Sequence, residues 1–174
     1  MPDDALTGLL AEQVDCYRAR DCTSLTAVDA AQEILALARG RVGDDDRVTF
    51  VHADLFSWRP GRAYDLVFLG FWLSHVPPDR FDGFWEVVGS ALAPGGRVVL
   101  VDDSLRPPDE LVEGEASATV LRRLEDGTPH RAVKVPYAPR ELEERLSALG
   151  WDARVTPLSD AAFYWCVGTR KAIR

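Results

Sequence analysis

The chain has 174 residues, of which 47% are apolar and 28% are charged, and its formal net charge is -8. This length fits one domain with a core of ordinary size, and the composition is that of a folded soluble protein rather than a disordered or membrane protein. The acids are spread along the chain, which argues against nucleic acid as the main ligand because phosphate binding needs a basic surface.

The first ten residues, "MPDDALTGLL", have neither a basic start nor a continuous apolar run. No window approaches the roughly 18 uninterrupted apolar residues that span a bilayer. We therefore expect a cytoplasmic protein with no membrane partner. The three cysteines have no CxxC spacing and the three histidines are scattered, so neither a disulfide framework nor a metal site is predicted.

The first half of the chain alternates between strand and helix patterns. Residues 5–18 have helical apolar spacing, residues 24–29 read as a strand, and residues 31–39 read as a second helix. Strands are expected at 47–52 and at 66–69, the latter nearly all apolar as in a parallel sheet covered on both faces. Three residues of the second helix are expected to face a sheet: Ile34, Leu35 and Leu37.

The pattern continues with a helix at 80–92, closed by "APGG", and a strand at 97–102. The inner face of this helix is expected to carry Phe81, Phe84, Trp85, Val88 and Leu92. Such an alternation predicts an α/β fold with a Rossmann-like, doubly wound, mainly parallel sheet.

The last third of the chain has a different character. Residues 118–135 alternate about a "DGTP" turn, which predicts a hairpin laid over the sheet. A helix within 137–151 has Leu142, Leu146 and Leu149 inward and is stopped by Gly150. The runs 152–156 and 162–168 predict a closing antiparallel pair of strands.

We expect one domain over residues 1–174. It would comprise an N-terminal helix and junction (1–23), a cofactor-binding half (24–104), and a segment of hairpin, helix and closing strands (105–174).

In a parallel sheet, ligands bind beyond the carboxyl ends of the strands. The residues at those ends are Asp29 with Ala30, Asp54 with Leu55, residues 70–75, and Asp102 with Asp103. Together they suggest an adenosine site.

Asp29 has two interpretations of equal weight. An acid after such a strand can accept hydrogen bonds from both hydroxyls of a ribose, but Asp is also a favoured helix cap. Asp54 could bind an adenine amino group while Leu55 covers the ring, although a plain turn residue is the commoner role.

The loop "GFWLSHVPPDRF" carries two large aromatics, Phe71 and Trp72, which either wall a binding site or pack beneath the hairpin. His75 is a candidate general base, and Asp102 and Asp103 could orient it. The alternatives are that His75 has a structural role and that Asp102 and Asp103 form a solvated turn.

Four stretches taken together resemble the class I S-adenosylmethionine-dependent methyltransferases, in the subgroup of small bacterial enzymes acting on metabolites. They are "LTAVDAAQEILALAR", "VTFVHADLFSW", "YDLVFLGFWLSHVPPDRFDGFWEVVGSALAPGGRVVLVDD" and "YAPRELEERLSALGW". The resemblance implies S-adenosylmethionine as cofactor and a small-molecule acceptor. By this resemblance Asp29, with Ala30 beside it, holds the ribose, Asp54 and Leu55 lie at the adenine, and Gly70 and Phe71 lie beside the methionine part.

One part of the family pattern is absent. The family has a central first strand that ends in a glycine-rich turn, D/E-x-G-x-G-x-G, whereas here "YRARD" runs directly into "CTSLTAVD". The flanking strands could pair directly, the N-terminal segment could fill the gap, or another chain could donate a strand, as in a homodimer. We favour direct pairing, because it needs no helical segment to refold.

Two functions follow. The first is S-adenosylmethionine-dependent methyl transfer to a small molecule, for which Phe71, Trp72 and Trp85 suggest an apolar metabolite and His75 a base. The second is a catalytically inactive remnant that acts as a binding or assembly protein, which the missing glycine turn favours. A nicotinamide-dependent reductase is a distant third, since it also needs a glycine turn and no Tyr-x-x-x-Lys pair occurs.

Overall fold

The structure is a computed structural model that describes residues 22–103, 118–123, 126–158 and 163–172. The chain forms two compact units, Met1–Trp58 and Arg59–Arg174, and each is described by itself. The helix expected at residues 5–18 lies outside the described residues, and a single domain over the whole chain stays a prediction.

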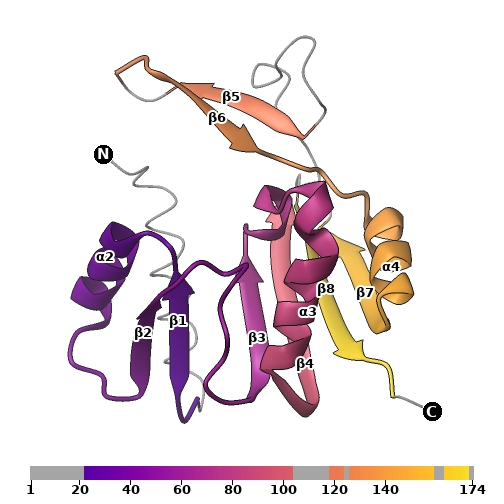
Figure 1. The fold of residues 1–174 in the computed structure, drawn as a ribbon, viewed down its shortest axis with the longest axis horizontal. Coiled ribbons are helices and arrows are strands. Elements are labelled where there is room, and N and C mark those ends of the chain that lie inside the picture. The colour runs from indigo at the N-terminus through magenta and orange to yellow at the C-terminus, as the bar shows by residue number, and fades with distance from the viewer. Residues whose placement is uncertain (1–21, 104–117, 124–125, 159–162, 173–174) are drawn as a thin grey trace. The chain divides into compact units, whose positions relative to one another are not determined.

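The first unit contains a strand, a helix and a second strand: β1 (Leu25–Asp29), α2 (Gln32–Val42) and β2 (Val48–His52) (Figure 1). The strands are parallel, with Leu25 opposite Val48 and Asp29 opposite His52. This is the connection that the alternating pattern predicts, because parallel neighbours need a crossover helix.

Helix α2 buries Leu35, Ala38 and Val42, which are three and four residues apart and so share one face. The expectation that Leu37 also faces the sheet was wrong, since its side chain is 44% exposed. Two residues correspond to about 200° around a helix, so Leu35 and Leu37 cannot both face the same strands.

The second unit is built on a four-stranded sheet in the order β3-β4-β8-β7. β3 (Tyr64–Gly70) and β4 (Leu92–Asp103) are parallel, whereas β8 (Phe163–Arg170) is antiparallel to both β4 and β7 (Trp151–Pro157). The closing antiparallel pair is therefore confirmed. Two 3-10 turns, η1 (Leu73–His75) and η2 (Pro78–Arg80), follow β3.

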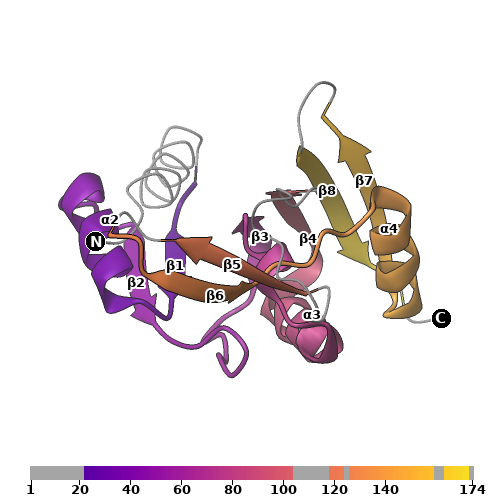
Figure 2. The same cartoon turned by 90° about the horizontal axis from the view of Figure 1, so that it is seen from above.

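Helices α3 (Phe81–Ala91) and α4 (Pro139–Ala148) cover one face of this sheet (Figure 2). Four of the five residues expected on the inner face of α3 are buried there: Phe81, Phe84, Trp85 and Val88. The fifth, Leu92, lies beyond the end of the helix as the first residue of β4 and is half-buried. Trp85 packs edge-on against Trp151 at 5.0 Å between ring centroids, so Trp85 belongs to the core and not to a binding wall.

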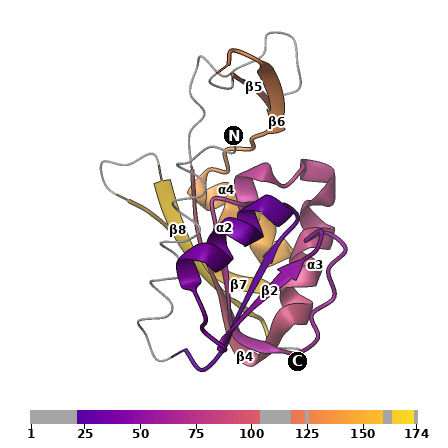
Figure 3. The same cartoon turned by 90° about the vertical axis from the view of Figure 1, so that its left-hand side faces the viewer.

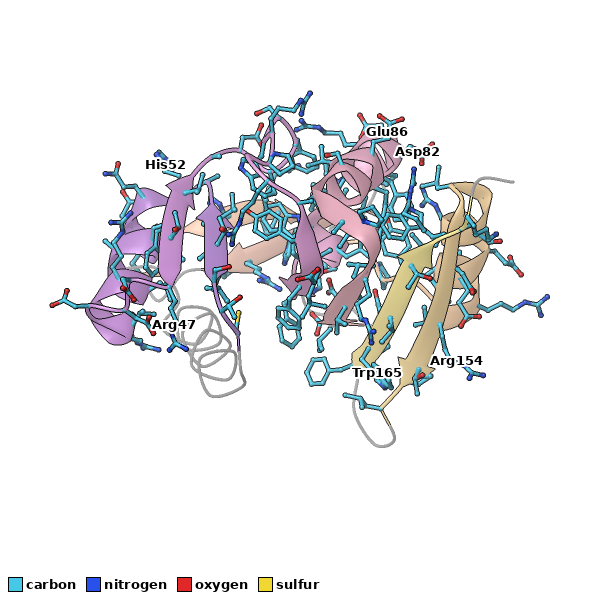
Figure 4. All side chains as sticks on the ribbon, turned by 90° about the horizontal axis from the view of Figure 1, so that it is seen from below. Arg47, His52, Asp82, Glu86, Arg154 and Trp165 are labelled. Carbon is cyan, nitrogen blue, oxygen red and sulfur yellow. The ribbon has the colours of Figure 1, made fainter. Side chains whose placement is uncertain are left out.

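The two faces of the sheet differ in exposure. Alternate residues of β4 and β8 are buried beneath the helices, whereas Trp165 and Phe163 on the other face are 40% and 38% exposed. In Figure 4, Trp165 and Arg154 project from one side of this unit, and Asp82 and Glu86 project from α3 on the other. The alternation follows from the two-residue period of a strand.

The expected hairpin is formed by β5 (Thr119–Arg123) and β6 (Pro129–Val133), which run antiparallel side by side (Figure 3). It was expected to lie over the sheet. Its contacts run instead to η1, beyond the end of β3 (Figure 1). The chain leaves β6 along η1, which fixes the hairpin at the carboxyl end of the sheet rather than on its face.

Direct pairing of the two strands around the missing one stays a prediction, because these strands, β1 and β3, belong to different units. Within the first unit β1 pairs with β2, and within the second unit β3 pairs with β4. Each of these parallel pairs is joined by a crossover helix. No helix within the described ranges is both long enough and apolar enough to cross a membrane.

Candidate functional site

In the first unit, the carboxyl ends of the parallel strands β1 and β2 bring Asp29, Ala30 and His52 together. Asp29 Oδ1 accepts a hydrogen bond from the backbone N–H of Ala31 at 2.7 Å. His52 Nε2 lies 2.9 Å from the carbonyl oxygen of Ala30, and the N–H of Ala53 donates to the carbonyl of Asp29 at 3.0 Å. One carboxylate oxygen of Asp29 thus orders the turn into α2, and Oδ2 accepts no hydrogen bond from a described residue.

Asp54 lies two residues beyond β2 and is exposed. Its Oδ1 accepts the N–H of Phe56 at 3.0 Å, and its backbone carbonyl accepts the N–H of Ser57 at 3.0 Å. These contacts are those of the turn residue considered as the alternative role. Leu55, beside it, is half-buried.

In the second unit, β3 ends at Gly70 and the chain turns sharply at Phe71. Phe71 has φ 52°, the left-handed region that residues with a β-carbon rarely adopt. Its N–H donates to the carbonyl of Val101 at 2.8 Å, and its ring packs edge-on against Phe163 at 5.6 Å. Such a conformation costs about 1–2 kcal/mol, and non-glycine outliers of this kind cluster at functional sites.

The turn η1 carries Ser74 and His75 beside the end of β4. Ser74 is fully buried, and its N–H donates to Oδ2 of the equally buried Asp102 at 2.9 Å. Asp102 Oδ1 also accepts the N–H of Asp103 at 2.8 Å. Asp102 therefore lies beside the turn that carries His75, but its carboxylate bonds to the backbone of η1 rather than to the imidazole.

His75 Nδ1 lies 2.7 Å from the carbonyl oxygen of Val133, at the end of β6. A carbonyl only accepts, so Nδ1 carries the proton and Nε2 has the free lone pair of the neutral ring. Burial is the main cause that lowers the pKa of His75, and the charge of Lys134 lowers it further. The imidazole is thus held neutral, with an acceptor nitrogen, as a general base requires.

Lys134 was not foreseen from the sequence. Its side chain is 2% exposed, and Nζ donates to Ser74 Oγ at 3.0 Å and to the carboxylate of Asp103. The sequence shows only a single cation inside the apolar run "AVKVPY", and a lysine at such a position is seldom fully buried unless it is paired.

Tyr164 was also missed. It is the cross-strand neighbour of Asp102, it is fully buried, and its phenol oxygen has no hydrogen-bond partner among the described residues. Burial, followed by the charge of Asp102, raises the pKa of Tyr164 far above its usual value. The phenol therefore stays protonated and adds a buried dipole beside the acid.

The sequence-predicted site residues thus form two groups. In the first unit, the carboxyl ends of β1 and β2 and the residues just beyond them include Asp29, Ala30, Asp54 and Leu55. In the second unit, the end of β3 and the turn that follows it include Gly70, Phe71 and His75. Parallel strand-helix-strand units with acids at their strand ends define a Rossmann-like α/β protein.

The chain belongs to the methyltransferase-domain family, whose model matches residues 7–96. It is 43% identical to DhpI in the DhpI–SAM–HEP complex, over 84% of this chain and 68% of that one, with a TM-score of 0.73. The DhpI–SAH complex gives 40% identity over 85% and 66% of the two chains, with a TM-score of 0.72.

A curated relative is the demethylmenaquinone methyltransferase of Clavibacter sepedonicus. It is 37% identical over 89 residues, which cover 51% of this chain and 35% of that protein. The matched region thus spans about a third of the length of this relative.

Proposed function

We propose that this chain binds S-adenosylmethionine and transfers its methyl group to a small-molecule acceptor. The observation that carries the proposal is the likeness to DhpI, at 43% identity and a TM-score of 0.73, because complexes of that protein contain SAM or SAH. The resemblance of the strand-end residues to the family pattern supports the same conclusion.

The residues of the first unit fit the adenosine half of this cofactor. Asp29 is half-buried, and Oδ2 is left to accept a ribose hydroxyl after Oδ1 has ordered the turn into α2. Ala30 beside it lacks a bulky side chain, and Leu55 offers an apolar surface to an adenine ring. In the second unit Gly70 and Phe71 are assigned to the methionine part by the resemblance alone.

His75 is proposed as the residue that accepts a proton from the substrate nucleophile. Nε2 is the acceptor nitrogen because Nδ1 donates to Val133, and the lowered pKa keeps the ring neutral near pH 7. The bound cofactor supplies an already activated methyl group, so the chain has mainly to orient the acceptor and exclude water.

The missing glycine-rich turn favours a second candidate, a catalytically inactive relative that acts as a binding or assembly protein. Such turns bring backbone N–H groups close to a ligand, and only glycine allows that approach. Without the turn we expect weaker binding of the methionine part. Cytoplasmic location and a homodimer remain predictions.

Thermal unfolding with and without excess S-adenosylhomocysteine separates the two candidates. A ligand at about 100 times its dissociation constant adds about 2.7 kcal/mol to the free energy of unfolding. We expect the midpoint to rise in the wild type and in Asp82→Asn, an exposed acid on α3, but not in Asp29→Ala. A wild-type midpoint that does not move would refute cofactor binding and favour the inactive relative.

A further inference from the structure

The segment that follows β6 contacts η1 at three successive residues. The carbonyl of Val133 accepts from His75 Nδ1 at 2.7 Å, and Lys134 Nζ donates to Ser74 Oγ at 3.0 Å. The N–H of Val135 then donates to the carbonyl of Ser74 at 2.7 Å. Two backbone contacts and one buried side chain therefore hold the Ser74–His75 dipeptide against the end of the hairpin.

Lys134 is the only charged residue of the segment in these three contacts. Because its side chain is buried, its ammonium group can lie only where it finds partners. An ammonium group is costly to remove from water unless it is paired and hydrogen-bonded. Asp103 supplies the paired carboxylate and Ser74 supplies a hydroxyl. Since Asp103 belongs to β4, the lysine ties the hairpin segment to the sheet as well as to η1.

The other side of η1 is also held. Asp102, on the same strand, accepts the N–H of Ser74 at 2.9 Å. The dipeptide is thus held between β4 and the segment that follows β6, so the position of the carbonyl that contacts the imidazole depends on that segment.

We infer that Lys134 is a positioning residue for His75: it holds Val133 in place, so that the imidazole keeps its proton on Nδ1 and presents Nε2 to the acceptor. The role of Nε2 rests on the proposed function. The tautomer itself does not, and can be measured without any cofactor or acceptor.

The charged groups that face His75 come from three elements. Lys134 follows β6 and Arg122 lies on β5, and both lower the pKa of His75, whereas Asp102 on β4 raises it. Removing the lysine charge and loosening the segment around the ring both act to raise that pKa. The lost bond to Val133 acts in the opposite direction.

The test is a long-range ¹H–¹⁵N correlation spectrum of the histidines, whose nitrogen shifts distinguish the two neutral tautomers. His75→Asn assigns the signal. Lys134→Met removes the charge and keeps most of the volume, and Asp103→Asn weakens the same contact with less disturbance. Lys171→Met is the matched control, because Lys171 Nζ also bonds a serine hydroxyl, that of Ser147 at 2.8 Å, but is exposed.

We expect one tautomer, with the proton on Nδ1, in the wild type and in Lys171→Met. In Lys134→Met and Asp103→Asn the ratio of the tautomers should shift by about tenfold, the factor that one hydrogen bond is worth. An unchanged ratio in folded Lys134→Met overturns the inference, and so does an unchanged ratio in Asp103→Asn if the first variant does not fold. Failure to bind S-adenosylhomocysteine with a normal tautomer would refute the proposed function alone.

Discussion

Gly96 passes so close to Tyr64 that a β-carbon on residue 96 would lie 2.9 Å from the carbonyl oxygen of Tyr64. The carbonyl oxygen of Ala93 would lie at the same distance. Both neighbours are backbone atoms, which cannot rotate away. The contact occurs where β4 begins to run beside β3, so residue 96 has to be glycine for the two strands to keep this register.

We predict that Gly96→Ala lowers the free energy of unfolding by about 1–3 kcal/mol, the usual cost of overpacking a well-packed site. Urea denaturation measures the change. Gly83→Ala is the matched control, because Gly83 is exposed on α3 and a β-carbon there meets no atom within 4 Å. It should gain about 0.5–1 kcal/mol from helix propensity. Equal effects of the two substitutions would contradict the proposed crowding.

Cys166 should resist thiol reagents in the folded protein. It is fully buried, and burial raises the pKa of its thiol to about 12, with a smaller contribution from Glu143. In a Cys16→Ser background, iodoacetamide at about pH 8 should modify the half-buried Cys22 and leave Cys166 unmodified until urea is added. Rapid labelling of Cys166 without urea would contradict its burial.

The raised pKa of Cys166 also makes the free energy of unfolding depend on pH in the alkaline range. The folded chain keeps the proton above the usual thiol pKa of 9.0, whereas the unfolded chain releases it. Stability should therefore fall as the pH rises from about 9 towards 12, and Cys166→Ala should make this decline shallower. Parallel declines in the two proteins would show that other groups cause it.

His75 should contribute to the acid side of the stability profile. Its folded-state pKa lies below the usual 6.5, so under mild acid the unfolded chain binds more protons. Stability should fall as the pH drops below about 6.5, and less so in His75→Asn, whose amide can still donate to Val133. Urea midpoints between about pH 5 and pH 8 measure this, with Gly83→Ala as the reference. Identical slopes in all three proteins would contradict the lowered pKa.

Most of the fold could be predicted from the sequence because its elements follow strong periodic patterns. The antiparallel closing strands match, and so do four of the five residues expected on the inner face of α3. The prediction that Leu37 faces the sheet was wrong, because a run of neighbouring apolar residues does not indicate which of them are buried. Sequence pattern also does not reveal how a gap in a sheet is accommodated, so the pairing of β1 with β3 stays a prediction.

The positions of the candidate site residues could be predicted where they depend on strand ends and not where they depend on the hairpin. Asp29, Asp54 and His75 follow strands, so the topology alone gathers them at carboxyl ends. Lys134 reaches Ser74 across 60 positions of sequence, and no periodic pattern indicates such a contact. A long-range contact of this kind depends on where a hairpin docks, which only three-dimensional packing decides.

The pair of indoles in the core links two parts of the chain that the family comparison separates. Trp85 lies within the matched stretch, residues 7–96, whereas Trp151 lies beyond it. Each ring is almost fully buried, and each covers the other. The end of the family match is therefore not a boundary of cooperativity: α3 and β7 should melt in one transition, and a fragment that ends at residue 96 would expose its largest core side chain to water.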